Sequence, residues 1–194
     1  MMEVRIQSSF LLNERFELPT EGLAEVVDRY RKAWEKVSQK TITGLEKVTG
    51  LPFSHSLIDC YIANSQSRDQ ISHPLVIGGG YTNREFLNAL IHSLIHILAD
   101  DNQQDYNWHE VAKKLWPKQE TFVAYHIMTN AVQEALYTDI MNNTDLVINL
   151  ISESRDLNRG ETHAKAWDVV EEKGYQKVLQ DLKDNSFVTD KKFA

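Results

Sequence analysis

Hydrophobic and polar residues follow one another in patterns that predict short strands near the start of the chain. Residues 2–8 alternate weakly, and residues 56–63 (SLIDCYIA) are apolar and partly β-branched, so both segments are predicted strands. A third strand is predicted over residues 73–77 (HPLVI), where Pro74 suits a sheet edge or the start of a strand. The three glycines at 78–80 then predict a turn.

Apolar residues that recur every three or four positions predict helices in the rest of the chain. One long helix is expected over residues 20–48, and four more are expected at 83–99, 108–115, 118–142 and 162–183. Strands that precede a group of helices indicate an α+β fold rather than a repeating βαβ sheet. We expect a single domain over residues 1–194, with a core at about 56–141 on which the helices at 20–48 and 162–183 pack.

The composition is that of a folded, acidic protein. Its 194 residues are 42% hydrophobic, and 21 basic against 28 acidic side chains give a net charge of −7. This balance argues against nucleic acid as a partner, because phosphate contacts need clustered Lys and Arg. Because no run of about 18 apolar residues and no signal-peptide pattern is present, we expect no membrane partner and a cytoplasmic location.

Histidine is more abundant than cysteine, with seven residues against one. A lone Cys60 cannot form an internal disulfide, and it excludes zinc sites built from several thiolates. Imidazole and carboxylate groups are therefore the ligands that a metal ion would find in this chain.

The predicted helix at 83–99 carries two histidines on an apolar background. Thr82 and Glu85 form a capping-box pattern at its start, and the residues that follow are apolar almost all the way round, which is typical of a buried helix. His92 and His96 are one turn apart on the remaining strip, so both rings can point at one cation. The alternative is a pair of core histidines that hydrogen-bond to backbone or carboxylate groups.

The segment 92–96 (HSLIH) resembles the active-site helix of zincin metallopeptidases, whose pattern is HExxH, except that Ser93 stands at the glutamate position. Residues 56–141 are similar to small zincins of the gluzincin or minigluzincin type in the order of their elements. These are an edge strand at 73–77, a glycine turn, the two-histidine helix and a second helix. The resemblance implies a bound zinc ion and a small mixed sheet whose edge strand packs against the HxxxH helix.

A third ligand is expected on the helix at 118–142, where His126, Asn130, Gln133, Glu134 and Tyr137 share one polar stripe. His126 gives a three-histidine site, and Glu134 gives the His-His-Glu set of gluzincins. His126 is preferred because Thr138 stands where gluzincins usually carry a further acid. A stripe that serves only helix packing is the remaining interpretation.

Ser93 is too short and too weakly basic to act as the general base of the zincin mechanism. We therefore expect a catalytically inactive or impaired pseudo-peptidase that binds peptide or protein, with Glu134 or Glu85 as the possible substitute base. The alternative function is a metal-free helical interaction module whose partner surface is formed by the first and last long helices. Polar neighbours suggest a surface position for His109 and His163.

Overall fold

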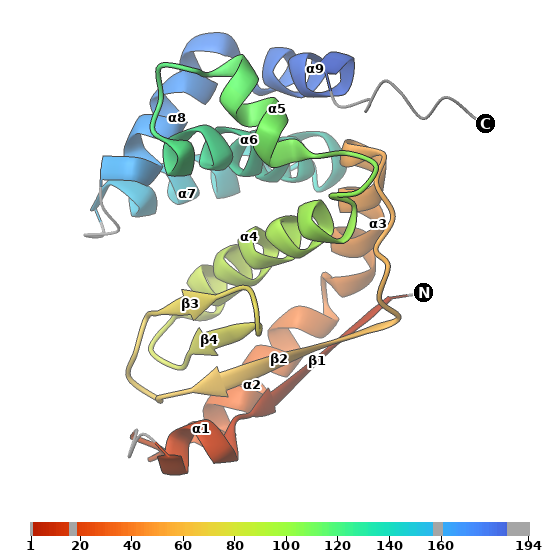
Figure 1. The fold of residues 1–194 in the computed structure, drawn as a ribbon. Helices are drawn as coiled ribbons and strands as arrows, with labels where there is room; N and C mark the ends of the chain where they lie inside the picture. Colours follow the sequence, from red (N-terminus) through yellow and green to blue (C-terminus); the bar gives the residue numbers. More distant parts are fainter. Residues whose placement is uncertain (1, 16–18, 157–160, 186–194) are drawn as a thin grey trace, which may run out of the picture. The chain divides into compact units, whose positions relative to one another are not determined.

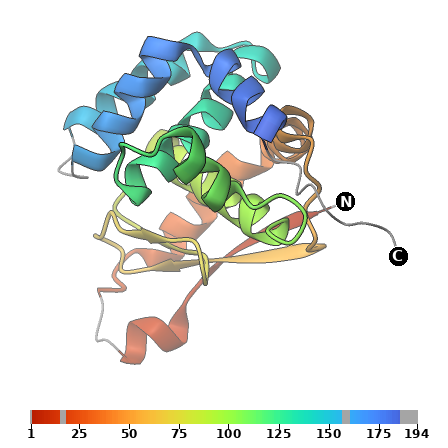
Figure 2. The same cartoon turned by 45° about the horizontal axis from the view of Figure 1, so that its top comes forward.

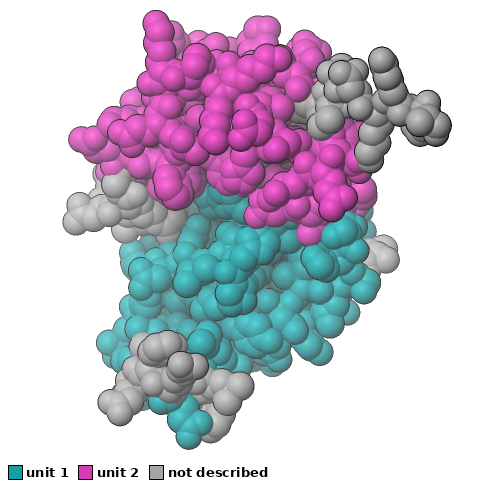
Figure 3. All heavy atoms as spheres, viewed as in Figure 1, with its two compact units in different colours: residues 1–43, 53–97 teal, residues 44–52, 98–194 magenta. Residues whose placement is uncertain are grey.

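A computed structural model describes residues 2–15, 19–156 and 161–185 and has a four-stranded mixed sheet together with several helices (Figure 1), which confirms the predicted α+β class. The chain divides into two compact units, coloured in Figure 3, and each is described here by itself. Unit 1 contains Met1–Thr43 and Phe53–Ile97, and unit 2 contains Gly44–Pro52 and Leu98–Ala194. The single domain expected over 1–194 stays a prediction. Within the described ranges, no helix is long and apolar enough to cross a membrane.

The sheet belongs to unit 1 and has the order β1-β2-β4-β3. β2 pairs in parallel with both β1 and β4, whereas β3 pairs antiparallel with β4. The strands are β1 (Glu3–Ser8), β2 (Leu57–Ala63), β3 (Gln70–Ile71) and β4 (Val76–Gly78). The two longer strands agree with the strands predicted from the sequence.

The edge strand predicted at residues 73–77 is wrong in both position and extent. β4 begins only at Val76 and lies between β2 and β3, so the two-residue β3 forms that edge of the sheet. His73 and Pro74 lie in the turn that joins β3 to β4. A proline has no N–H to donate, which explains why the ladder starts after Pro74.

The two faces of the sheet differ in polarity. Ile6 pairs with Cys60, and Ile62 pairs with Ile77, and all four side chains are buried on one face. On the other face of β1 and β2, Arg5 donates two hydrogen bonds to Asp59, at 2.7 and 3.0 Å. Figure 2 shows α2 (Leu23–Glu35) and α4 (Asn83–Asp101) along the same side of the sheet. The helices therefore cover the apolar face.

The other helices confirm most of the predicted segments but divide two of them. The expected helix at 20–48 is α2 followed by α3 (Ser38–Thr49), because the chain turns at Lys36–Val37. The expected helix at 162–183 is also two helices, because Gly174 adopts a left-handed conformation with φ 80° and ends the first. The remaining elements are α1 (Phe10–Arg15), α5 (Trp108–Leu115), α6 (Thr121–Ala135), the π-helix η1 (Leu136–Ile140), α7 (Thr144–Asp156), α8 (Glu161–Lys173) and α9 (Tyr175–Asn185).

Unit 2 is built around α6, which packs against α5, α8 and α9. Ala124, Ile127, Ala131 and Val132 of α6 are buried, which gives this helix its apolar contact surface. Trp167 of α8 is completely buried and donates its indole N–H to Ser154 of α7 at 3.3 Å. The helix that carries the predicted polar stripe is therefore the central helix of unit 2.

The glycine turn that precedes α4 is packed too closely for any side chain. A Cβ at Gly78 would lie 2.2 Å from the Ser67 carbonyl oxygen, and one at Gly80 would lie 2.4 Å from the Gln66 oxygen. Both obstacles are backbone atoms, which cannot move aside as a flexible side chain would. The glycines thus allow the turn to lie directly against residues 65–67.

Tyr30 of α2 joins this turn to α4. Its hydroxyl lies 2.8 Å from the Tyr81 carbonyl oxygen and 3.1 Å from that of Gly79, and its ring stacks on Phe86 with centroids 3.9 Å apart. Because Tyr30 is fully buried, its pKa is raised to about 12, so the hydroxyl keeps its proton as a donor. Tyr30 therefore helps to set where α4 begins.

Replacing Tyr30 by Phe should lower the free energy of unfolding by about 1–3 kcal/mol, because the ring stack stays while the buried Gly79 and Tyr81 carbonyls lose the hydroxyl donor and, among the described residues, only Tyr81 keeps another, from Arg29. Urea unfolding measures the change. The matched control is Tyr61→Phe on the partly exposed face of β2, where we expect a change within about 0.5 kcal/mol. Equal effects of the two substitutions would contradict this role for Tyr30.

Candidate metal centre

The two histidines of α4 point their rings at each other. The Nε2 atoms of His92 and His96 are 3.0 Å apart, and the ring planes meet at 68°. The surrounding helix is apolar and buried, as predicted, and His92 itself is only 8% exposed. The one-turn spacing thus brings two imidazole nitrogens together within unit 1.

This separation fits either a shared proton or a shared metal ion. Between two neutral imidazoles, one Nε2–H donates to the lone pair of the other Nε2. Two nitrogens bound to a tetrahedral zinc ion at 2.0–2.1 Å are about 3.3 Å apart, which is close to the separation in this pair. The separation alone therefore does not distinguish a hydrogen-bonded pair from two ligands of one ion.

The start of α4 is capped by Thr82 and Glu85, as the sequence predicted. The Thr82 N–H donates to Glu85 Oε2 at 2.7 Å, and the Glu85 N–H donates to Thr82 Oγ1 at 3.3 Å. Arg68 also pairs with Glu85 at 3.2 Å. Burial acts to raise the pKa of Glu85, but the Thr82 hydrogen bonds and the Arg68 charge lower it overall. A carboxylate held in this way is a poor proton acceptor, which argues against Glu85 as a substitute base.

Ser93, at the position of the zincin glutamate, is completely buried. Among the residues that the structure describes, its hydroxyl has no hydrogen-bond partner. A hydroxyl of this kind cannot take up a proton near neutral pH. Ser93 therefore supplies no general base beside the histidine pair.

His126 lies on α6, in unit 2, and is 9% exposed. Its Nδ1–H donates to the Phe122 carbonyl at 2.7 Å, which leaves the lone pair of the neutral ring on Nε2. Burial lowers the pKa of His126, although the Phe122 carbonyl acts in the opposite direction. The ring is therefore neutral and held in the tautomer of an Nε2 ligand.

His163 is a neighbour of His126 that the sequence did not indicate. The two ring centroids are 4.2 Å apart at an interplanar angle of 63°. His163 lies on α8, and its sequence neighbours are polar, so only the packing of α6 against α8 reveals this contact. Asn130 follows His126 by one turn and is buried, and its Nδ2 has no hydrogen-bond partner in the described part of the chain.

Glu134, the alternative third ligand, lies two turns beyond His126 on α6. Burial raises its pKa to about 7, and the negative charges of Glu171 and Asp139 act in the same direction. Asp139 also accepts a hydrogen bond from the Tyr175 hydroxyl at 2.7 Å. Glu134 is thus half protonated at neutral pH within an acidic part of unit 2.

A second group of ligand-type atoms lies where α4, α5 and α6 meet within unit 2. Asp100 Oδ1 is 3.3 Å from His109 Nε2 and 3.3 Å from the Tyr125 hydroxyl, and this hydroxyl also contacts His109 Nε2. The rings of His109 and Tyr125 stack with centroids 3.7 Å apart. The sequence predicted a surface position for His109, and its side chain is indeed 38% exposed, but no local spacing indicated this cluster.

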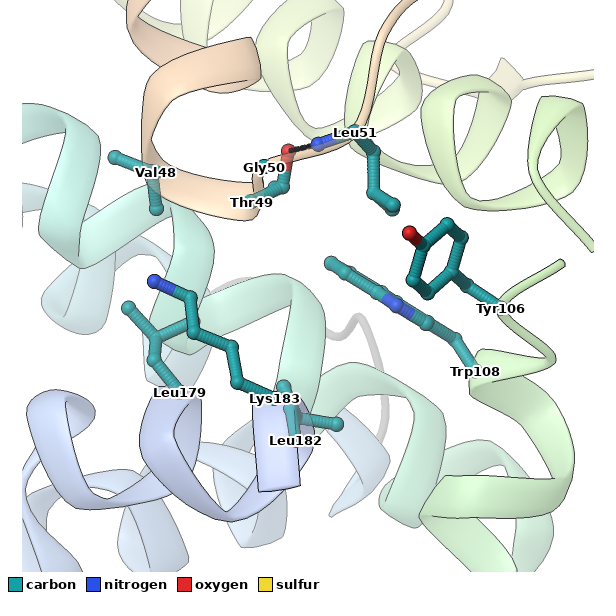
Figure 4. Close-up of a pocket in the computed structure, with 9 residues that line it drawn as sticks. All are labelled: Val48, Thr49, Gly50, Leu51, Tyr106, Trp108, Leu179, Leu182 and Lys183. Carbon is teal, nitrogen blue, oxygen red and sulfur yellow. Dashed lines mark hydrogen bonds between the residues drawn. The ribbon is translucent and has the colours of Figure 1, made fainter. Parts of the chain in front are cut away.

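Unit 2 also contains a cavity of about 240 Å³ with mostly apolar walls. Figure 4 shows the indole of Trp108 at this cavity, whereas the next residue, His109, contacts Asp100 and Tyr125. The lining residues are Val48, Thr49, Gly50, Leu51, Tyr106, Trp108, Leu179, Leu182 and Lys183. None of the predicted ligands lines this cavity.

The sequence-predicted site residues therefore belong to both units. The structure brings His92 and His96 together in unit 1, with Ser93 next to them in the chain, while His126 and Glu134 belong to unit 2. Comparisons with protein-family models, with curated proteins and with solved structures find no match for the chain.

Replacing Glu134 by Gln should stabilise the protein at pH 8. The folded-state pKa of about 7 lies above the ordinary value of 4.5, so the stability linked to this carboxyl is complete below pH 4.5 and is lost as the pH rises through 7. With allowance for its partial exposure, we expect a gain of about 1–2 kcal/mol at pH 8 and none at pH 4.

Thermal and urea unfolding at the two pH values measure this effect. The control is Glu172→Gln on the exposed face of α8, for which we expect no pH-dependent gain. A gain at pH 8 that persists at pH 4 would show that charge is not its cause.

Proposed function

We propose that this protein is a zincin-like metal-binding protein in which zinc is held by His92, His96 and a third ligand, His126 or Glu134. The observation that carries the proposal is the 3.0 Å separation of the His92 and His96 Nε2 atoms on a buried helix. Two imidazoles in an apolar environment are costly unless they are paired or coordinated. Since the spacing already suits tetrahedral coordination, a metal ion satisfies both rings at once.

The order of elements in unit 1 supports the same proposal. A short antiparallel edge strand, β3, precedes β4, the glycine turn and the two-histidine helix α4. The strand, glycine turn and two-histidine helix of the zincin resemblance are present in this order, but the strand before the turn, β4, is an inner strand and β3 forms the edge. A peptide could add to the sheet along such an edge through main-chain hydrogen bonds.

His126 is the preferred third ligand because its tautomer is already set. Histidine ligands of metals commonly donate the other ring N–H to a carbonyl or carboxylate, and His126 Nδ1–H donates to the Phe122 carbonyl. Glu134, by contrast, is half protonated at neutral pH, and a ligand carboxylate must first lose its proton. The assignment of a ligand from unit 2 to the histidine pair of unit 1 is itself part of the proposal.

The proposed role is binding rather than hydrolysis. Bound zinc would supply positive charge that polarises a carbonyl group. Ser93 cannot take a proton, Glu85 is held by Thr82 and Arg68, and only Glu134, with a pKa of about 7, is suited to accept one. We therefore infer an inactive or strongly impaired pseudo-peptidase that binds a peptide or protein segment.

The alternative is a metal-free helical interaction module. Its partner surface would lie on the helices at 20–48 and 162–183, whereas the exposed large apolar side chains Phe122 and Ile148 lie on α6 and α7. Zinc content separates the two functions, because this module needs no metal.

Zinc binding tests the main proposal directly. After chelator treatment of the full chain, isothermal titration with Zn²⁺ should show one equivalent whose affinity falls about 100-fold or more in the His92→Ala/His96→Ala double variant. His126→Ala should weaken the same binding, whereas Glu134→Gln should not. His73→Ala, a substitution in the turn before β4, is the matched control and should leave zinc affinity unchanged. The proposal would be contradicted if the His92→Ala/His96→Ala variant bound zinc as tightly as the wild-type chain.

Restoring the general-base glutamate at position 93 tests the inference that the chain is a pseudo-peptidase. Ser93→Glu should give zinc-dependent hydrolysis of a fluorescent peptide library at least about 10²-fold above the wild-type chain, because general-base catalysis contributes about 10²–10⁴ in rate. Ser93→Gln has nearly the same size without the base and should stay inactive, which separates chemistry from the cost of a larger buried side chain. Activity in the glutamine variant would contradict a role for the base. Absence of activity in a zinc-loaded glutamate variant would mean that more than the base is missing.

A further inference from the structure

We propose that Asp100, His109 and Tyr125 form a second metal site, contained within unit 2 and separate from the His92–His96 pair. The three side chains come from the last turn of α4, from α5 and from α6. Asp100 Oδ1, His109 Nε2 and the Tyr125 hydroxyl oxygen contact one another in all three combinations. A carboxylate, an imidazole and a phenol thus present their ligand atoms to one point.

Hydrogen bonding accounts for only part of this triangle. The Asp100 carboxylate only accepts, the Tyr125 hydroxyl has one proton, and His109 Nε2 has one proton or none. At most two protons therefore serve three contacts, so one contact always lacks a proton of its own. A metal ion, in contrast, accepts a lone pair from each of the three atoms.

Two of the three separations suit such an ion, whereas the Tyr125–His109 contact is shorter than two ligands of one ion allow, so these two side chains would move apart on binding. Ligand atoms bound at 2.0–2.2 Å with angles between 90° and 110° are about 2.8–3.6 Å apart, and both distances from Asp100 Oδ1 are 3.3 Å. Gln103 Nε2 also donates to Asp100 Oδ1 at 2.7 Å, which orients the carboxylate as an outer partner of a metal ligand would. The mixed oxygen and nitrogen donors fit a first-row transition ion such as zinc or iron, rather than a soft ion that prefers sulfur.

The cluster is partly exposed to solvent. The side chains of His109 and Asp100 are 38% and 26% exposed, so an ion has a path of entry and water can complete its coordination. A phenol has an ordinary pKa of about 10, so Tyr125 keeps its proton at neutral pH when no metal is present. Binding of an ion by the phenolate oxygen therefore releases one proton to solvent.

Zinc titration in a background without the first pair tests this second site. The full chain with His92→Ala and His96→Ala, stripped with chelator, should still bind about one equivalent of Zn²⁺ in isothermal titration. Binding should also produce the ultraviolet difference band of tyrosinate, which a purely structural role of Tyr125 would not give. Tyr125→Phe should abolish this band and weaken zinc binding at least about tenfold, and His109→Ala should weaken it similarly.

Tyr106→Phe is the matched control, because Tyr106 belongs to the same unit but lines the apolar cavity instead. It should keep both the affinity and the tyrosinate band. Circular dichroism of each variant verifies that it is folded, and Asp100→Asn offers a milder change where His109→Ala does not fold. Zinc affinity that is equal in the Tyr125→Phe and background proteins, or no binding in the background, would overturn the second site.

The two metal proposals fail separately. If only the second site exists, the wild-type chain binds one equivalent with a tyrosinate band, and His92→Ala/His96→Ala leaves both unchanged. If only the first exists, the wild-type chain binds zinc without the band, and the double substitution removes that binding.

Discussion

The burial of α4 is the constraint on which the rest of the structure depends. A helix that is apolar almost all the way round must be covered on most sides, and the sheet, α2 and the glycine turn cover it within unit 1. Polar side chains on such a helix cost free energy unless they are hydrogen-bonded or coordinated. His92 and His96 meet this condition by facing each other one turn apart, and Tyr30 fixes the start of the helix that carries them.

Much of the fold follows from local pattern, and the exceptions have identifiable causes. The periodicity over 83–99 predicts α4 well, because burial on all sides and the Thr82–Glu85 cap agree. The edge strand predicted at 73–77 was wrong. The apolar residues of this segment suggest a strand, but its proline delays pairing until Val76. The break at Gly174 depends on one backbone conformation, φ 80°, which apolar spacing does not reveal. α7 was not predicted, although its buried residues Val147, Leu150 and Ser154 have helical spacing.

The same contrast holds for the candidate sites. His92 and His96 could be paired from the sequence because a helix brings residues four apart onto one face. The polar stripe on α6 could be recognised from its helical spacing, but the residues that contact it from other helices could not. His163 reaches His126 only through the packing of α8 on α6, and Asp100, His109 and Tyr125 meet from three helices. Their sequence separations follow no rule of periodicity, so composition and spacing could not select them.

The two histidine-containing clusters differ in how many of their contacts the available protons can turn into hydrogen bonds. One proton satisfies the His92–His96 contact, so that pair is stable without metal, and a metal there competes with a good hydrogen bond. Two protons cannot serve all three contacts among Asp100, His109 and Tyr125, so an ion there meets less competition but must displace the phenolic proton. Nitrogen donors dominate the first cluster and oxygen donors the second, and the second therefore favours the harder ion. If the proposed sites bind metal, the ligand atoms, more than the helices that carry them, would decide which ion each cluster holds.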